Sequence, residues 1–171
     1  MKRPLVASVV AAGVFAVGGL ALAGTTQFRS HLTTANEIPA PVNVVGTPEG
    51  TLKLKLAPDG ESMRFDLKIT DPIEDLLMAH LHVQDPDSPT GLTGPIVVWL
   101  YPFGGTAPEL IEGQFKGHLS MGVITEASLV GPLAGNWEAF LDAIDAGQIY
   151  ANVHTVANPP GEIRDQVHPH P

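Results

Sequence analysis

The chain has 171 residues, no cysteine, and 18 acidic against nine basic residues, which gives a formal charge of −9. This excess of acids argues against binding to nucleic acid or to anionic lipid, and the absence of cysteine excludes disulfides and thiol nucleophiles. Its 16 prolines and 18 glycines punctuate short apolar stretches without any internal repeat, so we expect one β-rich domain.

The first 23 residues are typical of a secretory signal peptide. Lys2 and Arg3 precede an uncharged apolar run, residues 5–23, that ends in the small-x-small sequence Ala-Leu-Ala. An uncleaved signal anchor is the alternative, because the run approaches the roughly 20 apolar residues that span a bilayer. Cleavage would leave 148 residues with a formal charge of −11 and no membrane span. We therefore predict an exported protein of the periplasm, the cell wall or the extracellular medium.

Alternating apolar and polar residues predict strands along the rest of the chain. The clearest unit is a β-hairpin at residues 51–70, in which two period-2 strands flank the turn sequence Ala-Pro-Asp-Gly at residues 57–60. Further strands are expected at Gln27–Leu32, Met78–Val83, Ile96–Tyr101, Gln114–Leu119, Ile149–Val156 and Glu162–Val167.

One segment has helical periodicity instead. Asn136 can cap a helix whose apolar residues follow the spacing i, i+3, i+4, i+7, and Gly147 can end it. Thr125 can cap a shorter helical turn before it. Because helices do not alternate with the strands, we predict an all-β antiparallel sandwich with one helical excursion near residues 136–146.

Two histidines stand one residue apart in the sequence "AHLHV", residues 79–83. In a strand the odd-numbered residues share an apolar face that should be core, whereas His80 and His82 share the outward face with Cβ atoms about 7 Å apart. His154 takes the same outward position in the strand expected at residues 149–156. If the two strands are neighbours in one sheet, the three imidazoles can converge on a copper or zinc ion.

The alternative is that these histidines are unrelated surface residues. An exposed strand face tolerates histidine, and the rings can hydrogen-bond to Asp85, to Asp87 or to backbone carbonyls. His31 and His118 have no partner by spacing and are interpreted as surface residues, and residues 168–171 (His-Pro-His-Pro) as a flexible tail. The sequence contains no nucleophile elbow, phosphate loop or dinucleotide fingerprint, so we assign no catalytic residue.

Three stretches occur in order along the chain: "ANEIPAPVNVVGTPEGTLKLKLAPDG", "AHLHVQDPDSPTGLTGPIVVWLY" and "GQIYANVHTVANPPGEIRDQV". Together they resemble the CHRD domain, which is named after chordin and found widely in bacterial exported proteins. The resemblance covers residues 28–167, and "NEIP", "AHLH", "TGPIVV" and "NVHT…PGEIR" are its signature positions. Asp165 departs from the family pattern, which usually has Gly there, and we expect this departure to alter a local turn.

The resemblance implies an immunoglobulin-like β-sandwich or Greek-key barrel, remotely similar to copper/zinc superoxide dismutase, and no general biochemical activity. In that dismutase fold an H-x-H strand pair on the outer face holds copper. His80 and His82 match the pair, and His154 is the candidate third ligand. Dismutase activity is not expected, because the cysteines of its disulfide are absent and residues 85–95 contain no histidine.

Two functional hypotheses follow. The first is an exported binding or structural module with an unknown extracellular or envelope ligand. The second is a copper- or zinc-binding module that uses His80, His82 and His154. The two are distinguished by whether the strands that carry these histidines lie side by side.

Overall fold

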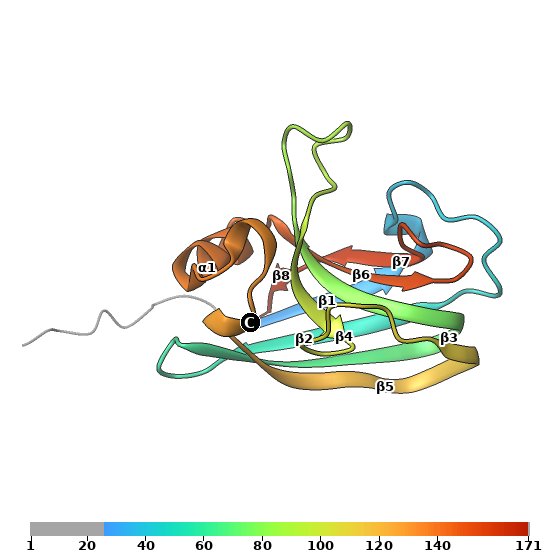
Figure 1. Ribbon diagram of the computed structural model, residues 1–171, viewed down its shortest axis with the longest axis horizontal. Coiled ribbons are helices and arrows are strands. Elements are labelled where there is room, and N and C mark those ends of the chain that lie inside the picture. The colour runs from blue at the N-terminus through green and yellow to red at the C-terminus, as the bar shows by residue number, and fades with distance from the viewer. Residues whose placement is uncertain (1–25, 171) are drawn as a thin grey trace, which may run out of the picture.

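The computed structural model describes residues 26–170 (Figure 1), so the predicted signal peptide lies outside the described residues. Single turns of 3-10 helix occupy Thr34–Asn36, Glu126–Ser128 and Gly131–Leu133. The other elements, in chain order, are β1 (Gln27–Thr33), β2 (Glu49–Leu56), β3 (Ser62–Val83), β4 (Ile96–Tyr101), β5 (Ile111–Thr125), α1 (Trp137–Asp145), β6 (Ile149–Thr155), β7 (Ile163–Gln166) and β8 (His168–Pro169). The prediction of an all-β fold with one helical excursion is confirmed.

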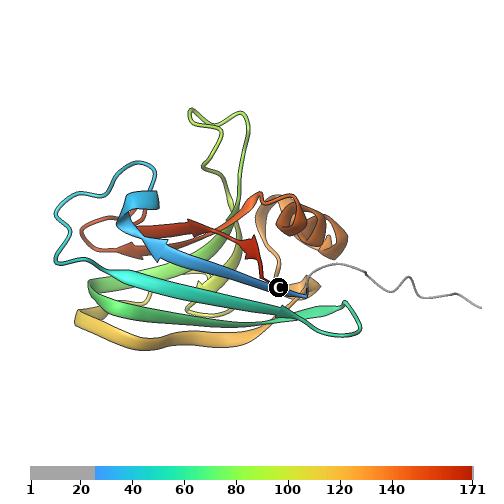
Figure 2. The same ribbon diagram turned by 180° about the vertical axis from the view of Figure 1, so that it is seen from behind.

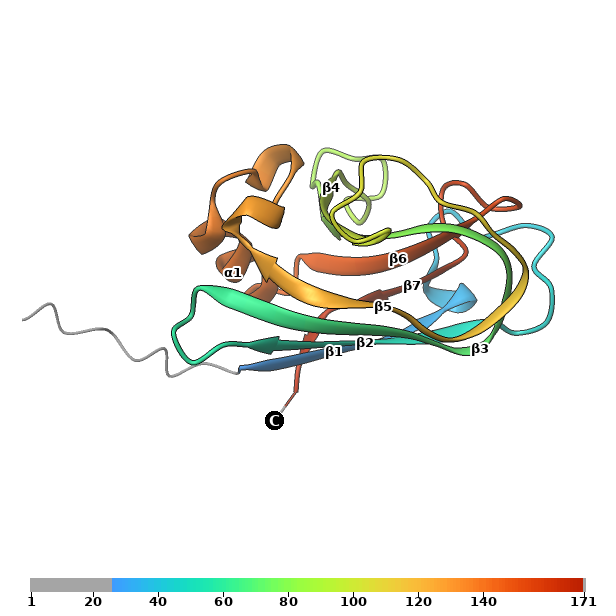
Figure 3. The same cartoon turned by 60° about the horizontal axis from the view of Figure 1, so that its bottom comes forward.

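The antiparallel strands close into a barrel. Neighbouring strands follow the order β2-β1-β7-β6-β3, and β3 pairs with β2 as well, which completes the ring. Strands β4 and β5 lie outside this ring, each paired with β3. Figure 3 shows β1, β2, β3 and β5 side by side as one curved layer.

The long strand β3 makes this closure possible. Its first half pairs with β2 and β5, and its second half pairs with β6 and β4. The sequence predicted two separate strands here, ending near Ile69 and starting at Met78. The chain instead continues through the acidic and proline-containing stretch 71–75, where it bends at Asp75, which has a φ of 46°.

The predicted hairpin is confirmed. Leu52 lies opposite Leu67 and Leu54 opposite Phe65, so their side chains enter the core from adjacent strands. The turn closes with the Gly60 N–H donating to the Ala57 carbonyl at 2.9 Å, and Gly60 has the positive φ of 75° that glycine tolerates.

The helix α1 begins and ends where the sequence predicts. The Asn136 side chain accepts a hydrogen bond from the Ala139 N–H at 3.1 Å, and Gly147 has a φ of 68°. Phe140 and Ile144 of α1 are buried in the same hydrophobic core as the strands. The buried hydrophobic residues of the described chain all lie between residues 28 and 167, so this segment contains the whole core.

The chain returns to β1 at its C-terminal end. Strand β8 pairs with β1, and the His170 N–H donates to the Gln27 carbonyl at 2.8 Å (Figure 2). The predicted tail, residues 168–171, therefore begins with this short strand. Among residues 26–170 the structure contains no helix with the length and apolar character needed to cross a membrane.

Asp165 lies within strand β7, so the expectation of an altered turn is wrong. Its carboxylate accepts from the His31 N–H at 2.7 Å and from the Asn36 side-chain amide at 3.1 Å. Strand β7 pairs with β1 through Arg164 opposite Thr33, and the Asp165 side chain extends this contact between the two strands.

We expect Asp165→Ala to lower the free energy of unfolding by about 1–2 kcal/mol, because two donors lose a charged acceptor. Urea unfolding at neutral pH measures the change. Asp87→Ala is the control, because Asp87 is exposed and its carboxylate makes no hydrogen bond within the described residues. An unchanged midpoint for Asp165→Ala would show that the two contacts contribute nothing to stability.

Candidate metal centre

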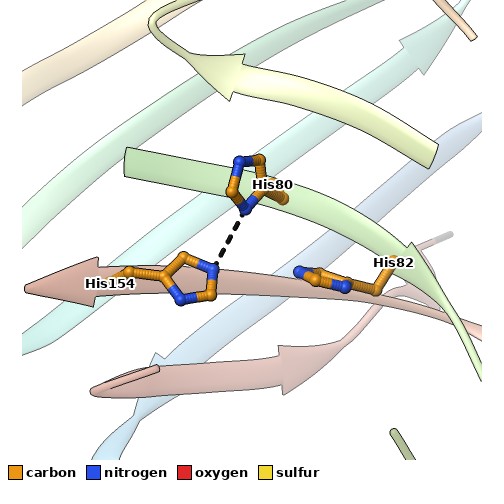
Figure 4. Close-up of side chains that lie close together, drawn as sticks. All are labelled: His80, His82 and His154. Carbon is orange, nitrogen blue, oxygen red and sulfur yellow. Dashed lines mark hydrogen bonds between the residues drawn. The ribbon is translucent and has the colours of Figure 1, made fainter. Parts of the chain in front are cut away.

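Strands β3 and β6 are adjacent and antiparallel, which the sequence left open. His80 lies opposite Asn152, and His154 lies opposite Met78, so His154 is diagonal to His80 across the strand pair. The three histidine rings turn toward one another on the same face of the sheet (Figure 4). One ligand nitrogen from each of His80, His82 and His154 lies within 4.8 Å of the other two.

These histidines are buried, so the expectation of an exposed outer face is wrong. The relative exposure is 0% for His80, 8% for His82 and 5% for His154. Their face lies outside the barrel core, because the alternating residues Ala79 and Leu81 point into that core. Three segments cover this histidine face on the outside of the barrel. They contribute the Glu37 carboxyl, the Gly94 carbonyl and the Pro159 carbonyl.

Two backbone carbonyls fix the tautomers of two rings. The Nδ1–H of His82 donates to the Gly94 carbonyl at 2.9 Å, and the Nδ1–H of His154 donates to the Pro159 carbonyl at 2.9 Å. In a neutral imidazole the other nitrogen, Nε2, then carries a lone pair. Second-sphere bonds of this kind orient histidines that bind metals. Both Nε2 atoms therefore carry the lone pair that a metal ligand needs.

The third ring completes the cluster. Nδ1 of His80 lies 3.0 Å from Nε2 of His154, and it donates there because the His154 proton is on Nδ1. Nε2 of His82 is buried without any hydrogen-bond partner among the described residues, and so is Nε2 of His80. An unpartnered buried nitrogen is costly, by about 1–3 kcal/mol, and each one therefore calls for an explanation.

Burial also keeps the three imidazoles neutral. Loss of hydration, together with the neighbouring rings of His154 and His82, lowers the pKa of His80 from 6.5 to about 2. Burial likewise lowers the pKa of His82 and that of His154 to about 4, against hydrogen bonds to Gly94 and Pro159 that raise them. At neutral pH none of the rings carries a charge, which is the state that binds metal.

The spacing of the nitrogens is close to that of a metal site. Three ligands held about 2.0–2.1 Å from one ion at tetrahedral or trigonal angles lie roughly 3.3–3.6 Å apart. The His80–His154 contact of 3.0 Å is slightly shorter, and the 4.8 Å limit of the cluster is longer. Small ring rotations would be needed to bring all three nitrogens to this spacing. Binding would replace the His80–His154 hydrogen bond, and the His80 proton would move from Nδ1.

Aromatic and cationic side chains hold the rings in place. Tyr150 stacks on His82 with a centroid distance of 4.8 Å and an angle of 6°, and the Arg164 guanidinium lies 3.6 Å above the Tyr150 ring. Arg164 also donates to the Leu92 carbonyl, which ties down the covering loop. Trp99 meets His80 edge to face at 4.3 Å.

Glu37 lies beside this group with an incompletely bonded carboxyl. Its Oε1 accepts from the Asn152 amide at 3.3 Å and from the Ile38 N–H at 3.0 Å, whereas the buried Oε2 has no partner among the described residues. Burial raises the pKa of Glu37 from 4.5 to about 7, although Arg164 acts to lower it. Gly161 packs so closely that a Cβ there would lie 2.5 Å from Oε2.

The remaining sequence-predicted polar residues lie elsewhere. Asp85 accepts from the Asp87 N–H at 2.9 Å, which makes a turn and not a contact with the histidines. His31 and His118 are exposed, as the sequence predicted, and form surface pairs with acidic side chains at 2.9 Å and 2.8 Å.

Several contributors to the site were not identified from the sequence. Gly94 and Pro159 act through backbone carbonyls, which no side-chain pattern reveals. Glu37 and Arg164 stand in the signature stretches "NEIP" and "PGEIR", but their spacing gives no sign that they meet. The available signal was the residue type: a charged side chain, Glu37 or Arg164, stands in a stretch that was interpreted as structural.

Comparison with protein families gives one match. The model of the CHRD domain matches residues 28–167, which is most of the chain. Searches of curated proteins and of solved structures found no match. The match spans the barrel strands, apart from Gln27 at the start of β1, and all three clustered histidines. The chain therefore belongs to the CHRD domain family.

Proposed function

We propose that this CHRD-domain protein is an exported metal-binding module that holds one copper or zinc ion through His80, His82 and His154. One observation carries the proposal: three buried, neutral imidazoles face one another, and Nε2 of His82 points into the cluster without a partner. Export is supported by the signal-like segment at residues 1–23 and by the family, whose members are typically exported.

A purely structural role explains the cluster less well. Burying one unpartnered imidazole nitrogen costs about 1–3 kcal/mol, and an apolar residue at position 82 would avoid this. A metal ion would instead provide a partner for the free lone pair. The carbonyls of Gly94 and Pro159 hold the rings of His82 and His154 in the tautomer that such binding needs.

The donor set restricts the metal. Three imidazole nitrogens suit copper, zinc and nickel, whereas magnesium and calcium prefer oxygen. Copper forms the strongest complexes with a given set of nitrogen ligands among the divalent first-row metals, so we expect tighter binding of copper than of zinc. When bound, the ion would supply Lewis acidity or, for copper, redox capacity.

Calorimetric titration of chelator-treated protein with Zn²⁺ and Cu²⁺ tests the proposal. We expect one ion per chain, and loss of this binding in His80→Ala/His82→Ala. Trp99 gives a second readout, because Cu²⁺ at His80 should quench its fluorescence, and Trp99→Phe should remove that signal. Trp137, on α1, serves as the internal reference.

Two control variants separate the buried cluster from other histidines. His31→Ala/His118→Ala removes two exposed rings, and His168→Ala/His170→Ala removes those near the C-terminus. Both should retain the high-affinity site. The proposal fails if the double variant of the cluster folds, as judged by circular dichroism, and still binds metal with unchanged affinity. His82→Gln provides a milder substitution if the double variant does not fold.

A further inference from the structure

The basic residues of this acidic protein are gathered on one face. Six of the seven lysines and arginines after residue 25 are exposed and belong to β1, β2, β3 or β5, which form one curved layer (Figure 3). They are Arg29, Lys53, Lys55, Arg64, Lys68 and Lys116. The argument from net charge against anionic lipid assumed evenly spread charges, whereas six of the seven described cations lie in this one layer, together with the acids Glu49, Asp66 and Asp71.

The pairing of these residues is unfavourable for the fold. Arg29 lies directly opposite Lys53 on the neighbouring strand, and Lys55 lies directly opposite Arg64. Like charges in directly opposed positions of a sheet destabilise it. Among the described acidic residues, Asp66 is the one that lines this region. Asp66, directly opposite Lys53, offsets part of this repulsion. The two pairs of opposed cations still cost stability, and binding of an anionic partner gives a reason for them to stand together.

A groove of about 450 Å³ runs between these four cations. Met121 and Val123 of β5 also line it, and they are 63% and 39% exposed. Exposed apolar side chains interleaved with cations match the boundary region of an anionic bilayer, where cations meet headgroups and apolar side chains enter below them. A hydrophilic polyanion would make no use of Met121 and Val123.

The groove also lies at the start of the described chain. Gln27, the first residue of β1, is part of its lining. An uncleaved apolar run at residues 5–23, which is the alternative to a cleaved signal peptide, would join the fold through this same end of β1. A second copy that docked with the same face is a less suitable occupant, because the four cations of one copy would then meet those of the other.

We propose that this basic face, defined by Arg29, Lys53, Lys55, Arg64, Met121 and Val123, docks on a membrane surface rich in anionic lipid. The inference is independent of metal binding. Acidic side chains on the far side of the barrel interfere little, because charges farther apart than the Debye length of about 8–10 Å are largely screened. Each cation near such a surface strengthens binding about fivefold.

Vesicle sedimentation tests this proposal with residues 26–171, which contain the whole core. We expect binding to vesicles of phosphatidylglycerol and phosphatidylcholine at low salt, and little binding to phosphatidylcholine alone or at 0.5 M NaCl. Lys53→Thr/Arg64→Thr should weaken the partition coefficient about 30-fold. Met121→Ala should weaken it further at constant charge.

The matched control is Thr106→Glu/Ala107→Glu, which makes the same change in net charge at two exposed positions between β4 and β5. This variant should bind almost as the unmodified chain does. Equal losses in both variants would overturn the proposal, because only net charge would then matter. Binding to a soluble polyanion without binding to vesicles would overturn it as well. So would a dimer that Lys53→Thr/Arg64→Thr dissociates, since the face would then join two copies.

Discussion

Chelator-treated protein should lose stability steeply as the pH falls from about 6.5 to 4.5. The three clustered histidines have pKa values of about 2 to 4 in the folded chain and 6.5 when unfolded, so unfolding takes up three protons in this range. Glu37 acts in the opposite direction, since its folded pKa of about 7 exceeds its ordinary value of 4.5 and unfolding releases its proton.

The net uptake of two protons fixes the sign and the size of the effect. Because the unfolded state binds more protons, stability rises with pH, by about 3 kcal/mol per pH unit in the middle of the window. Two pH units then remove about 5 kcal/mol, which is the lower end of the 5–15 kcal/mol that stabilises a typical domain. Urea unfolding at a series of pH values measures the slope.

Single variants should change this slope in opposite directions. His82→Gln removes one of the three proton-accepting rings and should lower the slope by about 1.4 kcal/mol per pH unit. Glu37→Gln removes the opposing group and should raise it by a similar amount. His118→Gln, at an exposed position, is the control. Identical slopes in all four proteins would show that the cluster is not buried in its neutral form.

Bound metal should raise the stability of the folded chain at neutral pH, and this gain should be lost once acid protonates the histidine rings. Zn²⁺ binds the deprotonated rings of the folded chain and adds stability according to its concentration relative to the dissociation constant. A hundredfold excess over that constant adds about 2.7 kcal/mol. This gain should vanish in His80→Ala/His82→Ala, which links the pH experiment to the proposed site.

Much of the fold could be predicted from local patterns. Period-2 alternation located the β2–β3 hairpin, and capping by Asn136 with termination at Gly147 located α1. The continuity of β3 could not be predicted, because Pro72 and its acidic neighbours resemble a break in the strand. The chain stays extended there only because β5 and β6 provide partners on either side of the bend.

The candidate site was predicted in part. Alternation placed His80, His82 and His154 on faces opposite the core, and tertiary pairing of β3 with β6 brought those faces together. Their burial could not be inferred, because it depends on loops that approach from outside the barrel. Short-range spacing contains no information on where the Gly94 and Pro159 carbonyls come to lie.

Arg164→Met should lower the free energy of unfolding by about 3 kcal/mol, which is a large change for a residue on a short strand at the barrel rim. Arg164 is 4% exposed, and its guanidinium stacks on Tyr150 at 3.6 Å and donates to the Leu92 carbonyl. Methionine keeps much of the apolar contact, but it loses the hydrogen bond to the loop and the charge that favours ionised Glu37.

A double-mutant cycle with Glu37→Gln identifies the part of this loss that is electrostatic. Without Arg164 the pKa of Glu37 should rise above about 7, since the opposing cation is gone and burial remains. If the two side chains are coupled, the double variant should be more stable than the sum of the single losses predicts. Lys68→Met, which removes an exposed cation, is the control. Strict additivity would show that Arg164 acts only through the Leu92 loop and Tyr150. Weaker zinc binding in Arg164→Met would then follow from movement of the Tyr150 ring, which stacks on His82.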